Sequence, residues 1–179
     1  SREQLEDIPS LDYDTEIQNI IALKQTYEEK YQTTIPVFVA GGMFTAEDAT
    51  HVMELGADGI QAATRFVATE ECDASDAYKQ AYVNASDDDV IIIKSPVGMP
   101  GRAIKNAFIE RMLTAPDKIS HCFNCLKACN PVTAPYCITQ ALINAVVGDL
   151  DNGLIFCGSR VGEITKITTV PKLMQELTV

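Results

Sequence analysis

The chain has 179 residues, of which 46% are apolar and 22% are charged, a composition typical of a folded globular protein. This length suits one domain, with or without an appendage, and the composition excludes disordered and fibrous proteins. The sequence contains no apolar run near the roughly 20 residues of a membrane span, and no basic-then-apolar export signal. We therefore expect a cytoplasmic protein without a membrane partner.

Acidic residues are concentrated in the first half of the chain. Residues 1–90 contain 5 Lys or Arg and 19 Asp or Glu, whereas residues 91–179 contain 9 and 6. An acidic surface of this kind disfavours binding to nucleic acids and to anionic membranes. We interpret it as a solvated face that keeps the protein in solution, and we expect no nucleic-acid partner.

Helices and strands are predicted to alternate in residues 15–85, which implies parallel strands with helical crossovers. Isoleucines and tyrosines recur at helical spacing after Asp14, which is placed to cap the first helix. The run Ile-Pro-Val-Phe-Val-Ala has the unbroken apolar character of a strand buried on both faces. The predicted elements are a helix over 15–31, a strand over 35–40, a helix between Thr45 and Gly56, a strand over 57–63 and a helix over 73–85.

The helix between the two predicted strands has recognisable end signals. Thr45 and Asp48 have the three-residue spacing of a capping box, in which each side chain accepts a hydrogen bond from the other residue's backbone N–H. Gly56 has the position of a helix-terminating glycine. The sequence therefore predicts both ends of this short helix.

The second half of the chain is predicted to be mainly helical. An apolar run at 90–94 is followed by a Pro- and Gly-rich stretch at 95–101, which predicts a structured loop. The predicted helices cover residues 102–113, 138–147 and 170–177, and a short apolar stretch lies at 154–157.

Small residues follow both predicted strands of the first half, where a phosphate group fits. Gly41-Gly42 ends the first strand, and the segment 61–64 ends the second strand, about one strand–helix repeat later. Backbone N–H groups exposed by small residues attract anions, and so does the N-terminus of a following helix. The alternative needs no ligand. In it, Gly41-Gly42 is an ordinary turn after the first strand, and the small residues after the second strand are a tight packing contact.

Two segments of the chain resemble a single enzyme family. They are VFVAGGMFTAEDATHVMELGADGIQAATRF and, further along, KSPVGMPGRAIKNAF. The first is similar to the region of the seventh and eighth strands of the nitronate monooxygenase family, formerly called the 2-nitropropane dioxygenases. The FMN-dependent enoyl-acyl-carrier-protein (enoyl-ACP) reductases II belong to the same family. The second segment resembles the part that follows the barrel, and the resemblance covers residues 35–113 and extends more loosely to the end.

The resemblance implies an α/β fold, namely the C-terminal part of a (β/α)8 TIM-type barrel with FMN at its C-terminal mouth. Residues 1–86 would supply the last βα units of this flavin-binding barrel, strands 7 and 8 with their flanking helices. Residues 87–179 would form a mainly helical C-terminal extension that contains a Cys-rich loop.

The resemblance also implies a set of residues that bind the cofactor. It places the FMN phosphate against the backbone of Gly41 and Gly42, with Gln61, Ala63 and Thr64 completing the site. The family more often has Gly where this chain has Ala63, and a Cβ at that position narrows the approach to the phosphate.

The resemblance covers only part of a barrel, which needs about 250 residues. Residue 1 would fall just after the sixth strand, and the histidine that serves as the base in many members lies outside these residues. Neither His51, expected on an exposed helix face, nor His121 matches that base, so we assign no catalytic residue. We expect the isolated chain to be inactive, with its open sheet edge covered by rearrangement or by self-association into a homo-oligomer.

Four cysteines lie close together in the second half, with the spacing C-x2-C-x3-C-x7-C. Four thiolates from one loop suit tetrahedral zinc or an iron–sulfur cluster. Unligated thiols, some of them buried as small apolar side chains, are the alternative, and Cys72 and Cys157 are expected to be packing residues. The four candidate ligands are Cys122, Cys125, Cys129 and Cys137.

The resemblance implies an FMN-dependent oxidoreductase of the nitronate monooxygenase type. An NAD(P)H-dependent enoyl-ACP reductase II is the alternative within the family. A non-catalytic metal-binding module built on the four cysteines is the alternative outside it. The expected partner is therefore a small-molecule substrate, either a nitronate or an enoyl thioester, the second together with NAD(P)H.

Overall fold

Helix α2 (Tyr13–Tyr31) begins two residues earlier than the sequence predicted. The computed structural model describes residues 12–96, 98–116, 118–127 and 129–178. The residue that precedes the helix in extended conformation is Asp12, and Asp14 lies within the first turn. The prediction of Asp14 as the cap was therefore wrong. A carboxylate inside the first turn also complements the positive end of the helix dipole, so the residue type alone does not distinguish the cap from the first turn.

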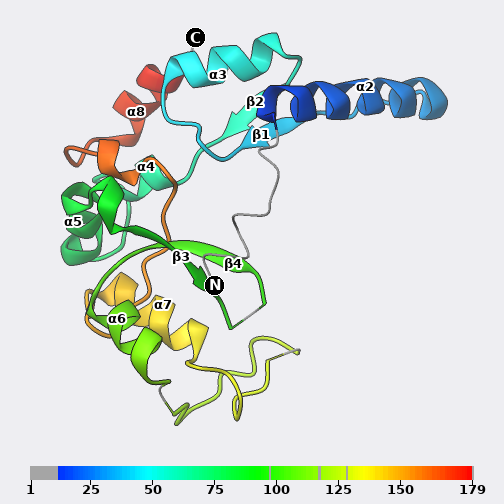
Figure 1. Cartoon of the computed structure of the whole chain (residues 1–179). Helices are drawn as coiled ribbons and strands as arrows, with labels where there is room; N and C mark the ends of the chain where they lie inside the picture. Colours follow the sequence, from blue (N-terminus) through cyan, green and yellow to red (C-terminus); the bar gives the residue numbers. More distant parts are fainter. Residues whose placement is uncertain (1–11, 97, 117, 128, 179) are drawn as a thin grey trace. The chain divides into compact units, whose positions relative to one another are not determined.

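Strands β1 (Phe38–Ala40) and β2 (Gly59–Gln61) are parallel neighbours, as Figure 1 shows. The parallel pairing expected from the sequence is thus confirmed, although both strands are shorter than predicted. The expectation that the first strand is buried on both faces was wrong. Val39 is buried, whereas Phe38 is 63% exposed, because successive side chains point to opposite faces and the apolar cluster of this unit lies on the Val39 face.

Helix α3 (Ala46–Glu54) connects the two strands and has the ends that the sequence predicted. The Asp48 backbone N–H donates to the Thr45 hydroxyl at 3.3 Å, and the Thr45 N–H donates to the Asp48 carboxylate at 2.7 Å. The capping box is therefore confirmed. Gly56 has a φ of +107°, the left-handed conformation that favours glycine at the end of a helix.

The chain divides into two compact units after Ala62. The first unit comprises the described residues up to Ala62 together with those from Gln175 onward, and the second extends from Ala63 to Met174. The boundary predicted between residues 86 and 87 has a different meaning, because it separates the last units of a barrel from a C-terminal extension. It stays a prediction. Each unit has an apolar core of its own.

Most of the helices and strands described in the second unit are helices. The helix predicted over 73–85 begins only at Asp76 (α5), because its cap is Ser75, whose hydroxyl accepts a hydrogen bond from the Tyr78 N–H. The predicted helices over 138–147 and 170–177 are confirmed. The helices of this unit are α4 (Thr64–Val67), α5 (Asp76–Asn84), α6 (Ala107–Thr114) and α7 (Ile138–Val147), with single 3-10 turns η1 (Asp87–Asp89) and η2 (Val161–Glu163). Helix α8 (Val170–Leu177) begins in this unit, and the division after Met174 falls within it.

Strands β3 (Val90–Lys94) and β4 (Pro100–Ile104) form an antiparallel hairpin that the sequence did not predict. The expected helix over 102–113 begins only at Ala107, so its first turn was predicted wrongly. Proline is tolerated at the first residue of a strand, and a Cβ at Gly101 would collide with the ring of Phe156. Gly101 therefore allows the Phe156 ring to pack closely on the hairpin, and it does not mark a loop.

The core of the second unit lies between the hairpin, α6 and α7. The apolar stretch predicted at 154–157 passes through this core, and Leu154 is fully buried. The fully buried Tyr82 of α5 donates its hydroxyl proton to the Phe156 carbonyl at 2.7 Å, which fixes α5 to the same stretch. The core residues are Ile93, Ala103, Phe108, Ile109, Tyr136, Ala141 and Leu154.

None of the helices in the described ranges combines the length and apolar character needed to cross a bilayer.

Candidate functional site

Two glycines in the left-handed conformation end strand β1. Gly41 has a φ of +91° and Gly42 a φ of +76°, both disfavoured for residues with a side chain. Both residues are exposed, and a Cβ built on either would meet no atom within 4 Å. A side chain at either position would therefore meet no further atom, so there is room for a phosphate beside Gly41 and Gly42.

The end of strand β2 lies directly beside this loop. Ala40 is opposite Gln61 in the parallel pairing, so the carboxyl ends of both strands meet at one edge. Ligands of open α/β sheets bind at such carboxyl ends. The side chain of Gln61 is exposed there. The structure thus brings Gln61 beside the strand end that precedes Gly41 and Gly42.

The other two predicted residues open the second unit. Ala63 is exposed and precedes helix α4, whose four residues form a single turn with little macrodipole. The Thr64 hydroxyl accepts a hydrogen bond from the Gly158 N–H at 2.9 Å, which ties α4 to the segment after Cys157. Roles of Ala63 and Thr64 in cofactor binding therefore stay predictions.

Side chains from α2 and α3 hold the elements around the glycines. The Tyr13 hydroxyl contacts the carbonyl oxygens of Ala40 and Gly41 at 3.0 and 3.3 Å. Both oxygens of the Asp14 carboxylate lie 2.9 Å from Nε2 of His51. The hydrogen bond to Asp14 raises the pKa of His51 above its usual value of 6.5, the charge of Asp14 adds to this rise, and burial opposes it. His51 is exposed, as predicted, but it pairs with α2.

A second ion pair fixes the beginnings of the two strands. The Lys24 ammonium donates to the Asp58 carboxylate at 2.6 Å, and the same carboxylate accepts the Val37 N–H at 2.8 Å. These hydrogen bonds lower the pKa of Asp58, and the bond to Asp58 raises the pKa of Lys24. The pair lies at the strand ends opposite the glycine loop, so we assign it a structural role.

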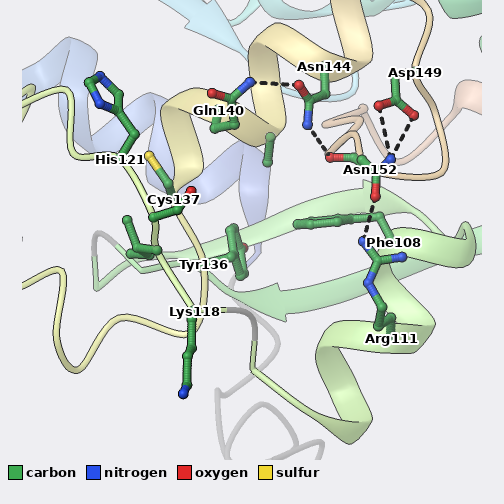
Figure 2. A pocket seen from close by; sticks show the side chains of 13 residues that line it. Phe108, Arg111, Lys118, His121, Tyr136, Cys137, Gln140, Asn144, Asp149 and Asn152 are labelled. Carbon is green, nitrogen blue, oxygen red and sulfur yellow. Dashed lines mark hydrogen bonds between the residues drawn. The ribbon is translucent and has the colours of Figure 1, made fainter.

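A pocket of about 220 Å³ lies in the second unit, among α6, α7 and residues 118–121 (Figure 2). One wall is a chain of hydrogen bonds: Gln140 donates to Asn144 at 2.7 Å, and Asn144 donates to the Asn152 carbonyl at 3.0 Å. The guanidinium of Arg111 donates to the Asn152 side chain at 2.9 Å. None of the five predicted cofactor-binding residues lines this pocket.

Tyr136 at this pocket is buried and contacts the ring of Phe108 edge to face, with 5.1 Å between ring centroids. Its hydroxyl has no hydrogen-bond partner among the residues that the structure describes. Burial raises the pKa of Tyr136 to about 12. This hydroxyl is therefore neutral at physiological pH.

The predicted cysteine site is not assembled in the structure. Within the described ranges, no three His, Cys, Asp or Glu side chains are grouped so that they would hold a metal ion. The Cys125 thiol accepts a hydrogen bond from the Thr139 hydroxyl at 3.0 Å, and Cys122 contacts Asn124. The described residues therefore give no support for zinc or an iron–sulfur cluster, and we assign no chemistry to either.

Two further thiols lie apart from that segment. Cys157 is partly buried beside the core, and burial raises its pKa to about 11, although the neighbouring Arg102 opposes the rise. Cys72 is also partly buried, and its carbonyl accepts a hydrogen bond from the Lys79 ammonium at 3.2 Å. A raised thiol pKa disfavours the reactive thiolate form, which agrees with the packing role expected for Cys157.

The family model described as "Nitronate monooxygenase" matches residues 10–179, almost the whole chain. The chain belongs to this family. The family is one of oxidoreductase enzymes, so the resemblance read from the sequence is confirmed.

Individual relatives match parts of the chain. A probable nitronate monooxygenase of Staphylococcus saprophyticus is 36% identical over 88 residues, which cover 49% of this chain and 25% of that protein. The chain thus spans about a quarter of the length of the curated relatives that it matches.

Solved structures share the α/β fold. FabK from Thermotoga maritima superposes with a TM-score of 0.65 at 29% identity, covering 81% of this chain and 43% of that chain. The enoyl reductase domain of MlnA from Bacillus amyloliquefaciens has a TM-score of 0.68 at 14% identity, covering 94% and 54%. The second likeness concerns the fold alone.

Sequence reasoning missed the side chains that support the glycine loop. Tyr13 precedes the helix that the sequence predicts over 15–31, and Asp14 is predicted as the cap of that helix. The contacts of Tyr13 with Ala40 and Gly41 span 27 and 28 residues, and the pair of Asp14 with His51 spans 37. Local sequence patterns do not report contacts over such separations. The one signal in the sequence was that Tyr13 is an aromatic residue at helical spacing from the apolar residues that follow it.

Proposed function

We propose that this chain forms part of an FMN-dependent oxidoreductase and that the loop Gly41-Gly42 binds the FMN phosphate. Nitronate monooxygenase is the activity that we assign to the whole protein, because the family model and the curated relatives carry that description. When bound, FMN supplies the redox chemistry by accepting electrons from the substrate.

One observation carries the proposal: two consecutive exposed glycines with positive φ at the carboxyl end of a parallel strand. Successive backbone N–H groups in turns form anion-binding concavities, and glycines of positive φ are typical of turns. The absence of any atom within 4 Å of a Cβ built at either glycine supports the fit of a phosphate. Gln61, at the neighbouring strand end, would donate a hydrogen bond from its side-chain amide to the same group.

The residues of this chain have binding roles in the proposal. The glycine backbone donates hydrogen bonds to phosphate oxygens and orients the cofactor. The catalytic base that the resemblance implies lies outside this chain, so no residue here is assigned to proton transfer from the substrate. Ala63 and Thr64 are further candidates for the same phosphate, through their sequence neighbourhood to Gln61.

Comparing FMN with riboflavin tests the phosphate site, because the two ligands differ only by that phosphate. We expect the chain to bind FMN at least tenfold more tightly than riboflavin in a fluorescence titration. Gly41→Val places a branched side chain at the open backbone and should remove this preference, whereas the matched Gly98→Val, also at an exposed glycine of positive φ, should not. Equal affinity for both ligands in the unsubstituted chain would contradict the proposal.

An enoyl-ACP reductase is the second candidate, because FabK shares the fold at 29% identity. The two activities differ in their reductant. A polypeptide of the relatives' full length that includes this chain should consume a nitronate and O₂ without NAD(P)H if the first proposal holds. Loss of an enoyl thioester that depends on NAD(P)H, without nitronate turnover, would favour the second.

A further inference from the structure

Helix α2 has a second apolar face beside the one that packs on its own unit. The inner face includes the buried Ile17 and also Lys24, whose ammonium pairs with Asp58 at 2.6 Å. Next to it, apolar side chains that are 46 to 58% exposed recur along the helix. They are Ile20, Leu23, Tyr27 and Tyr31. Single exposed apolar side chains are common on protein surfaces, but a row of them along one helix face is typical of an interaction surface.

The spacing of this face is that of a coiled coil. Apolar side chains at alternating separations of three and four residues form the seam along which two helices pack. Ile20, Leu23 and Tyr27 follow this spacing. Glu16 and Lys30 continue it at either end, and we call these five residues the outer seam of α2. Its centre is apolar and its two ends carry opposite charges.

The charges at the two ends of the outer seam are accessible. Glu16 and Lys30 are both exposed, and within the described ranges of the chain neither forms an ion pair. The Lys30 ammonium lies over the ring of its neighbour Tyr31, 5.1 Å from the ring centroid. A contact of this kind leaves the ammonium open to an acidic group from another molecule.

We propose that the outer seam binds the same seam of a second copy of this chain, with the two helices antiparallel. Glu16 and Lys30 lie seven residues on either side of Leu23. An antiparallel copy with a two-fold axis at Leu23 therefore places each Lys30 opposite the Glu16 of the other copy. Ile20 and Tyr27 flank Leu23 at three and four residues, so the isoleucine of one copy lies near the level of the tyrosine of the other.

Charge decides between the two possible orientations. A parallel pair would place Glu16 opposite Glu16 and Lys30 opposite Lys30, and like charges at facing positions repel. The helix dipoles also favour the antiparallel pair, since opposite ends then lie side by side. The same complementarity favours a second copy as the occupant, because this chain presents both charges at matching distances from the centre of the seam.

The proposed interface is small, so the association is weak. The outer seam extends over about four helical turns. A single pair of helices of this length buries less surface than a standard protein interface, and we expect a dissociation constant of about 10 to 100 µM.

Sedimentation equilibrium of the whole chain tests the surface. The apparent mass should rise from that of one chain to that of two over a concentration range that spans the expected dissociation constant. Leu23→Asp places two like charges at the axis and should keep the chain monomeric. Leu113→Asp is the matched control, because Leu113 is a 71% exposed leucine of α6, and this variant should still dimerise. If the unsubstituted chain stays monomeric throughout, the proposal is wrong and a different polypeptide covers the seam.

Charge reversal tests the pairing and its direction. Glu16→Lys and Lys30→Glu should each weaken dimerisation about tenfold, because the two-fold axis makes every substitution act at two contacts. An equimolar mixture of these two variants should associate as tightly as the unsubstituted chain, since each copy then meets opposite charges at both ends. Glu29→Lys is the matched control, because Glu29 is an exposed acid of α2 outside the seam, and it should change nothing.

The mixture also separates a lost interface from a misfolded variant, because a misfolded chain does not regain association when it meets its complement. Single reversals that leave the affinity unchanged would contradict the antiparallel pairing. A dimer that survives Leu23→Asp would have its interface elsewhere, which would overturn the proposal. The outer seam does not include the glycine loop, so these outcomes are independent of the proposed phosphate site.

Discussion

The glycines after β1 and the glycine before Leu154 are required for opposite reasons. A Cβ at Gly41 or Gly42 would meet no atom within 4 Å, and only the positive φ disfavours a side chain. A Cβ at Gly153 would lie 2.6 Å from the backbone N and Cα of Ala145 in α7. The first two glycines leave space for a ligand, whereas Gly153 lets two chain segments pack, and the sequence shows the same residue in both places.

The largest effect is expected for Gly153→Ala, because the added methyl group meets backbone of α7 and not a flexible side chain. We expect the free energy of unfolding to fall by about 3 kcal/mol, measured by urea unfolding followed by circular dichroism. Ala145→Gly in the same chain should not restore stability, since the contacted N and Cα atoms remain. A loss below about 1 kcal/mol would show that α7 moves easily, and would weaken the contrast between the two kinds of glycine.

Asn106→Ala should be the next most destabilising change. The Asn106 side chain accepts the Ile109 N–H at 3.1 Å as the cap of α6, and it donates to the carbonyls of Leu150 and Gly153 at 2.9 and 2.8 Å. Loss of the cap and of both other bonds should lower the free energy of unfolding by about 2 kcal/mol.

Asn106→Asp separates the two contributions. The carboxylate can still accept the Ile109 N–H but cannot donate to the two carbonyls, so we expect an intermediate loss in the same urea experiment. If Asn106→Asp is as stable as the unsubstituted chain, the bonds that hold the Gly153 turn contribute nothing, and the tight packing there has another cause.

Gly41→Ala should have a smaller effect, because only the backbone conformation opposes it. A left-handed φ at a residue with a Cβ costs about 1 kcal/mol. Gly41→Asn should cost less, since asparagine tolerates this conformation better. If urea unfolding shows that Gly41→Ala destabilises the chain as much as Gly153→Ala does, the contrast between the open glycine and the packed glycine is wrong.

The smallest effect is expected from the pair of His51 and Asp14, because both side chains are about half exposed. Asp14 raises the pKa of His51 above 6.5, and Glu54 and Asp48 act weakly in the same direction. The contribution of the charged pair is therefore fully present below about pH 6.5 and is lost as the pH rises through the raised pKa of the folded state.

An NMR titration of the His51 ring checks this expectation directly. The pKa should exceed 6.5 and should fall toward that value in Asp14→Asn, which removes the carboxylate charge. His51→Gln should flatten the decrease of the unfolding midpoint between neutral and alkaline pH. An unshifted pKa would mean that the contact between α2 and α3 does not depend on protonation.

The sequence by itself determined the features that depend on neighbouring residues. The capping box of Thr45 and Asp48, the glycine at 56 and the helix α7 follow from spacings of a few residues, and the structure confirms them. The family follows from motifs that are contiguous in the chain. Gly41 and Gly42 were identifiable as a candidate phosphate loop for the same reason, because consecutive glycines after an apolar run are a local pattern.

Only the tertiary structure decided the features that depend on distant residues. Pro100 and Gly101 belong to a strand because β3 pairs with them and Phe156 packs on the glycine. Tyr13 reaches the glycine loop across 28 residues, and His51 meets Asp14 across 37. Local propensities set which conformations a segment favours, but burial and hydrogen bonds to remote segments select among them, and these contacts exist only once the chain has folded.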